Sequence, residues 1–229
     1  VDRVFTINIT NVNEAPFDID LSKTNVDENL PAGTVVGNLT TRDPEGGLFT
    51  YSLVPGSGGT DNSAFTITGA QLKTAASFDH EAKNTHSIRV RTTDSTNLAY
   101  EEVFTIQVNN VNEFPSVTVN GSIGNCPSNS LPYFTWTASD PDNNLSSVQA
   151  VVTRNGEAVF SRNYTSSVSN ERLDLNAYGR GTFIITVTAT DSGGLSRSST
   201  RTVNVLNSPP HATLAVTTNP PDRLEGSDI

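Results

Sequence analysis

The chain has 229 residues, with 24 acidic side chains against 14 basic ones and a formal net charge of −10 at pH 7. This excess of acid argues against nucleic acid and anionic membrane as partners, because both attract clusters of Lys or Arg. No apolar run approaches the roughly 18 residues that a membrane-spanning helix needs, so we expect no direct insertion into a membrane.

One segment of the sequence is repeated. The segment VFTINITNVNEAP at 4–16 returns as VFTIQVNNVNEFP at 103–115, and a weaker copy, VNVLNSPP, follows at 203–210. A period of about a hundred residues is the size of one β-sandwich domain. We therefore predict four segments of a longer protein: the terminal strand and linker of a preceding repeat (1–16), a first domain (17–115), a second domain (116–208), and a linker or the start of another domain (209–229).

Several runs alternate apolar and polar residues with a period of two, which is the pattern of a half-buried strand. In chain order they are 4–10, 87–91, 103–108, 148–152 and 183–189. Segments rich in Gly, Pro, Asp and Asn separate them and predict turns. We predict an all-β chain of two tandem antiparallel Greek-key β-sandwiches. Trp136 is expected in a core, and the single cysteine, Cys126, is expected as a buried thiol.

The acids concentrate in the predicted first domain, at its turns. Residues 17–115 carry 13 acids and 6 bases, whereas residues 116–208 carry 6 of each. Ca²⁺ takes six to eight oxygen ligands in forgiving geometry, so several short acidic segments that meet at one end of a sandwich suit it. Asp and Asn before Pro or Gly are also ordinary turn residues, and this reading stays open for DPDNN and DSGG taken alone.

These motifs resemble the cadherin repeat, in its bacterial cadherin-like form. Glu28 in DENLPAGTVVG looks like the family's first calcium-binding glutamate, FDHE is similar to its Asp-Arg-Glu motif, and NVNEFP resembles a shortened linker. The resemblance implies one or two Ca²⁺ ions at a junction near Pro115, held by Glu28, Asp79, Glu81, Asn110, Asn112, Glu113, Asp140, Asp142 and Asp191. It implies a weaker partial site, which lacks its upper repeat, at Asn11, Asn13, Glu14, Asp43, Glu45 and Asp94. His80, which stands where Arg is usual in the motif, is expected to face solvent.

The second predicted domain departs from the cadherin pattern, since it has no early Glu and no Asp-x-Glu motif. FTWTASDPDNNLSS and GTFIITVTATDSGGLS resemble bacterial immunoglobulin-like modules of the polycystic-kidney-disease type. The resemblance implies an Ig-like sandwich that accepts calcium at one end only.

Two functions fit these observations. The first is a pair of calcium-stiffened spacer or adhesion domains in a large secreted or cell-surface protein of bacterial origin, which contacts neighbouring repeats and an unknown protein or polysaccharide. The second is a carbohydrate- or protein-binding accessory module of a secreted enzyme, although no cluster of aromatic residues indicates a sugar platform. No nucleophile elbow and no paired His and nucleophile occur, so we expect no catalytic residues and no enzyme.

Overall fold

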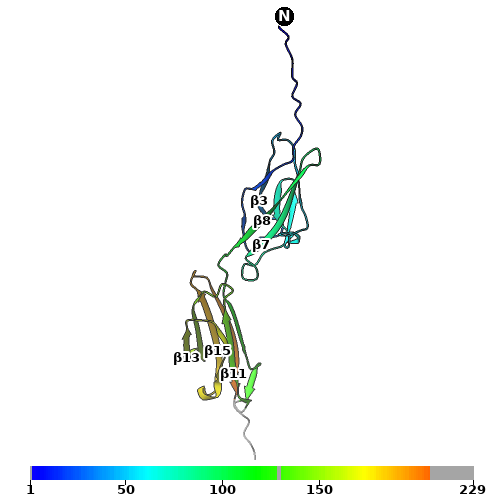
Figure 1. The fold of residues 1–229 in the computed structure, drawn as a ribbon. Coiled ribbons are helices and arrows are strands. Elements are labelled where there is room, and N and C mark those ends of the chain that lie inside the picture. The colour runs from blue at the N-terminus through cyan, green and yellow to red at the C-terminus, as the bar shows by residue number, and fades with distance from the viewer. Residues whose placement is uncertain (1, 128–129, 207–229) are drawn as a thin grey trace, which may run out of the picture. The chain divides into compact units, whose positions relative to one another are not determined.

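The computed structural model describes residues 2–127 and 130–206. The chain divides into two compact units, which meet between Glu113 and Phe114 and which we call unit 1 and unit 2. In the described part of the chain, the helical elements are short 3₁₀ turns, η1 (Asn62–Ala64) and η3 (Leu175–Tyr178), and the other regular elements are strands (Figure 1). The predicted all-β class of tandem sandwiches is confirmed. Among the described residues, no helix is both long and apolar enough to cross a membrane.

Unit 1 is a sandwich of two four-stranded sheets. One sheet has the order β1 (Asp18–Leu21), β3 (Val35–Arg42), β6 (Gln71–Thr74), β5 (Phe65–Thr68). The other has the order β2 (Asn25–Asp27), β8 (Ala99–Asn109), β7 (Thr85–Thr93), β4 (Thr50–Leu53). The pairs are antiparallel except for β2 with β8, which run parallel. Because alternate residues of a strand face opposite sides, β7 buries Ile88 and Val90 in the core of this unit.

Unit 2 joins a five-stranded sheet to a three-stranded one. The larger sheet has the order β10 (Asn125–Pro127), β16 (Ser196–Leu206), β15 (Gly181–Asp191), β12 (Leu145–Arg154), β13 (Glu157–Tyr164). The smaller sheet has the order β14 (Val168–Asp174), β11 (Tyr133–Ser139), β9 (Ser116–Gly121). Trp136 is 1% exposed and Cys126 is 8% exposed, so both lie in this core, as predicted.

The alternating run at 4–10 forms no strand in this structure. Its apolar side chains are open to solvent, with Phe5 at 82% and Ile9 at 92% exposure. A strand is stable only when its backbone N–H and C=O groups pair with a neighbour, and none of the described strands pairs with this segment. Its assignment to a preceding repeat, like the predicted bounds 17–115 and 116–208, stays a prediction. The prediction for 209–229 lies outside the described residues.

Candidate metal centre

Three acids from distant parts of the chain meet at one end of unit 1. Glu28 follows β2, Glu81 lies in the loop between β6 and β7, and Glu113 follows β8. One ligand oxygen from each lies within 4.8 Å of the others. The pairing explains the meeting, because β2 and β8 run parallel with Asp27 opposite Asn109 and so leave the sheet in the same direction.

Glu28 is the buried centre of this group, with 2% of its surface exposed. Its Oε2 accepts the backbone N–H of His80 at 2.6 Å, and its Oε1 accepts the backbone N–H of Val111 at 2.8 Å. The carboxylate therefore ties the β6–β7 loop to the segment that leaves β8. Each carboxylate oxygen has further lone-pair capacity, so these bonds leave room for a cation.

Two asparagines hold the other carboxylates. The Nδ2 of Asn110 donates to Oε1 of Glu81 at 3.1 Å, and the Nδ2 of Asn29 donates to Oε1 of Glu113 at 2.8 Å. Asn29 adopts a left-handed backbone conformation (φ 60°), which Asn tolerates better than most residues. The sequence motifs did not single out Asn29, although its position directly after Glu28 was a usable signal.

Asp79 has a structural role in the same loop, between β6 and β7. Its Oδ1 accepts the backbone N–H of Ala82 at 2.9 Å, and its carbonyl accepts the backbone N–H of Lys83 at 3.0 Å. The exposed Asp79 side chain thus caps the turn that presents Glu81. Asn112 is exposed directly before Glu113.

His80 does not simply face solvent, contrary to the prediction. Its Nδ1 lies 2.7 Å from the carbonyl oxygen of Val108, and a carbonyl only accepts, so Nδ1 carries the proton. Together with the bond from its backbone N–H to Glu28, this contact fastens the loop to β8. The neighbouring acids suggested that His80 is exposed. The carbonyl oxygen of Val108 near the end of β8 accepts a hydrogen bond from its ring instead, and the sequence does not reveal this contact.

Unit 2 carries its own group of acids. Asp140 directly follows β11, Asp142 lies in the same turn, and Asp191 ends β15. Asp140 is 5% exposed and Asp191 is 2% exposed. Burial raises the pKa of Asp140, and the nearby carboxylates of Asp142 and Asp191 raise it further.

The Asp140 carboxylate has little compensation for its burial. The backbone N–H groups of Asn144 and Asp142 lie close enough to lower its pKa in part, but neither meets the geometry of a hydrogen bond to it. The Oδ1 of Asp191, by contrast, accepts the backbone N–H of Leu195 at 2.9 Å. A buried carboxylate of this kind is one that a cation stabilises in its charged form.

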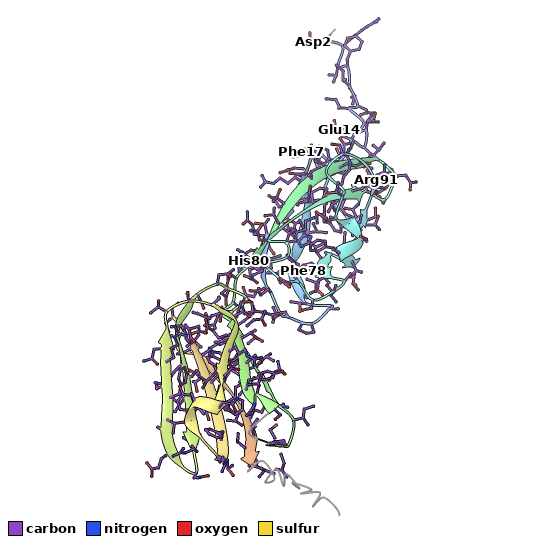
Figure 2. All side chains as sticks on the ribbon, turned by 90° about the horizontal axis from the view of Figure 1, so that it is seen from below. Asp2, Glu14, Phe17, Phe78, His80 and Arg91 are labelled. Carbon is purple, nitrogen blue, oxygen red and sulfur yellow. The ribbon has the colours of Figure 1, made fainter. Side chains whose placement is uncertain are left out.

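Residues of the predicted partial site contact one another at the other end of unit 1. Figure 2 shows Glu14 at one end of this sandwich and His80 at the other. The Nδ2 of Asn13 donates to Oδ2 of Asp94 at 2.7 Å, and the Nδ2 of Asn11 donates to Oε1 of Glu45 at 3.2 Å.

Within this second group, Asp43 and Asp94 act largely as turn caps. The Oδ1 of Asp43 accepts the backbone N–H of Glu45 at 3.0 Å, and the Oδ1 of Asp94 accepts that of Leu98 at 2.9 Å. A hydrogen bond with the side chain of Glu45, followed by its charge, raises the pKa of Glu14. Weak cation binding by this exposed group stays a prediction.

Comparison with known proteins finds sequence similarity to cadherins. Rat cadherin-17 is 32% identical over 114 residues, which cover 48% of this chain and 14% of that protein. Human protocadherin-16 is 27% identical over 203 residues, covering 82% of this chain and 6% of that protein. The chain is thus similar in sequence to cadherins. It spans a small fraction of these curated relatives, and no family model matches it.

Solved structures agree on the fold of the cadherin-like chain. The EC1-2 structure of human protocadherin-24 is 19% identical, covers 87% of this chain and is itself covered in full, with a TM-score of 0.51. At this identity the likeness shows the fold alone. It adds support to the tandem sandwiches and nothing on what the cadherin-like repeats bind.

Proposed function

We propose that this chain is a pair of calcium-stiffened spacer or adhesion domains of an extracellular or cell-surface protein. The observation that carries the proposal is the convergence of Glu28, Glu81 and Glu113 within 4.8 Å at one end of unit 1. Like charges at that distance repel each other, whereas a shared cation turns the repulsion into attraction.

The geometry suits calcium. Two oxygens bound to one ion lie at most about 5.2 Å apart, because a Ca–O bond is at most about 2.6 Å long. The spacing of at most 4.8 Å meets this limit. The ligand atoms are all carboxylate oxygens, which suit a hard cation, and Asn110 and Asn29 orient two of the three side chains.

The second half of the proposed site comes from unit 2. Asp140, Asp142 and Asp191 form a group whose shared charge is unfavourable in the absence of a cation. We propose that this group and the unit 1 acids share one or two Ca²⁺ ions near Pro115, with Asp79, Asn110 and Asn112 completing the set. When bound, calcium would supply the link that holds the two sandwiches to one linker.

We also propose that unit 1 is of the bacterial cadherin-like type and that unit 2 is an Ig-like module. The shortened linkers NEAP and NEFP support the bacterial cadherin-like type, and the DPDNN and DSGG turns of unit 2 support an Ig-like module. Neighbouring repeats and an unknown protein or polysaccharide remain the proposed partners. An accessory sugar-binding module has no support in the comparisons, and the single Trp, at 1% exposure, offers no stacking platform.

The test is thermal unfolding with small-angle scattering, in calcium and in chelator. Calcium at 100 times its dissociation constant adds about 2.7 kcal/mol to the free energy of unfolding. The double variant Glu81→Gln with Glu113→Gln should lose most of that gain, whereas Glu157→Gln, an exposed acid of β13, should keep it. If the wild type shows the same melting temperature and maximum dimension in both solutions, calcium stiffening is wrong.

A further inference from the structure

His86 is a buried titratable residue outside both acid groups. It lies on β7 opposite Ile106 of β8 and is 7% exposed. Its ring stacks on Phe78, with centroids 4.5 Å apart and planes 25° apart, and meets Phe65 of β5 edge-on at 5.7 Å. Among the described residues, neither ring nitrogen has a hydrogen-bond partner. An imidazole in such an apolar enclosure is held in its neutral form.

The charges of two side chains, Asp61 and Lys83, act on the ring. The Oδ2 of Asp61, just before η1, lies 4.0 Å from Nδ1 of His86. The Nζ of Lys83, from the β6–β7 loop, is 2.5 Å from the other oxygen of Asp61. Burial lowers the pKa of His86, the charge of Asp61 offsets part of this, and the charge of Lys83 adds to the lowering.

Phe78 and Lys83, which contact His86 and Asp61 respectively, are the two ends of the loop that carries Glu81. Phe78 precedes Asp79 directly, and its carbonyl accepts the backbone N–H of Asn29 at 3.0 Å. At the other end, Lys83 donates its backbone N–H to Asp79 and its ammonium to Asp61. Figure 2 shows Phe78 and His80 close together at this end of unit 1. A displacement of the His86 ring therefore acts on loop 78–83.

We propose that His86 is an acid-sensitive latch for loop 78–83. When the ring is neutral, it packs against both Phe65 and Phe78, and Asp61 pairs with Lys83 alone. When it takes a proton, the imidazolium needs hydrogen-bond partners that this pocket lacks. It then gains them by competing with Lys83 for Asp61 and by moving toward water, and either movement loosens Phe78 and the turn that presents Glu81.

The consequence for cation binding rests on the proposed function, but the latch itself does not. Loosening the loop moves Glu81 relative to Glu28, so acid weakens a cation site before the acids themselves are protonated. Protonation of His86 at a pH below its ordinary pKa of 6.5 costs folding stability, because the unfolded chain binds the proton more tightly.

The first experiment uses the full chain in chelator. Proton NMR titration should give His86 a pKa below 6.5, and hydrogen exchange, corrected for intrinsic rates, should show amides 78–83 losing protection between pH 7.5 and 5.0. In His86→Phe, which keeps an aromatic ring without a titrating nitrogen, this pH-dependent loss should disappear. A His86 pKa at or above 6.5, or an equal loss of protection in the variant, would overturn the latch. If the variant does not fold, the wild-type titration and exchange decide the matter.

The second experiment is a calcium titration of the wild type and His86→Phe at pH 7.5 and pH 5.5. The wild type should lose several-fold more affinity on acidification than the variant. Equal losses in both proteins would overturn the coupling of the latch to the cation site. An acid response in chelator without calcium binding at either pH would keep the latch and overturn the proposed function instead.

Discussion

Single side chains decide which loops of unit 1 are held in place, and the motifs revealed only some of them. Glu28, Glu81 and Glu113 stood out because they occupy acidic segments in cadherin-like order. Asn29 and the contact of His80 with Val108 did not, because a hydrogen bond between distant segments leaves no periodic trace in the sequence.

Asp61 is the clearest residue that the sequence concealed. It belongs to no motif, yet its carboxylate accepts the backbone N–H of Ser87 at 2.8 Å and pairs with Lys83 at 2.5 Å. The hydrogen bond from Lys83 holds the pKa of Asp61 below its ordinary 3.8. The stability it adds is therefore present above pH 3.8 and is lost as the pH falls through the lower folded value.

Asp61→Ala is expected to lower the free energy of unfolding by about 1–3 kcal/mol, because it leaves the N–H of Ser87 and the ammonium of Lys83 without their acceptor. The loss should already be present in chelator, where no cation contributes to stability. Denaturant unfolding measures it, with Asp20→Ala as the control. Asp20 pairs with Arg42 at the exposed surface, where ion pairs contribute about 0–1 kcal/mol. A loss for Asp61→Ala no larger than for Asp20→Ala would contradict this role.

At the scale of elements, the period-two pattern located four long strands but missed others, such as β3 and β16, as well as the short ones. The runs at 87–91, 103–108, 148–152 and 183–189 lie in β7, β8, β12 and β15. Strands of three residues, such as β2 and β10, are too short to show a period, and both join their sheets in parallel. The run at 4–10 has the alternating pattern but forms no strand. A strand needs a partner as well as a pattern, and none of the described strands pairs with this segment.

Backbone contacts between elements of unit 1 leave one glycine no room for a side chain. A Cβ on Gly37 of β3 would lie 2.8 Å from the carbonyl oxygen of Lys23, in the segment between β1 and β2. Gly37→Ala is expected to cost about 1–3 kcal/mol in the free energy of unfolding, the usual effect of overpacking. Thr40→Ala, exposed on the same strand, is the control and should change the midpoint of urea unfolding far less. Equal midpoints for the two variants would show that the Lys23 segment moves away at little cost.

At the scale of the whole molecule, the sequence predicted two sandwiches and a charge that gathers in the first. The spacing of the repeated segment predicted the two domains, and the count of acids in each predicted where the charge lies. The burial of Asp140 and Asp191 was not predictable, since DPDNN and DSGG read equally well as plain turns. Only the folded unit 2 shows that burial raises the pKa of Asp140 and that the carboxylates of Asp142 and Asp191 raise it further.

Asp140→Asn separates the cost of the buried charge from its proposed use in joining the two units. Because the folded pKa of Asp140 is raised, its charged form costs unit 2 stability at neutral pH, and the neutral isostere should raise the melting temperature in chelator. In calcium, the same change should remove much of the gain of about 2.7 kcal/mol expected at 100 times the dissociation constant. The two effects have opposite signs, which a general loss of folding cannot produce.

The measurement is a thermal melt of the full chain with and without calcium, with hydrogen exchange reading each unit separately. Asp174→Asn is the control, because this side chain is 62% exposed and carries the same change of charge within unit 2. If the two units share the ion, Asp140→Asn should lower the calcium-dependent protection of loop 78–83 in unit 1 as well as that of the Asp142 turn. Loss confined to unit 2 would mean that each unit binds its own cation, and the proposed clamp between the sandwiches would then be wrong.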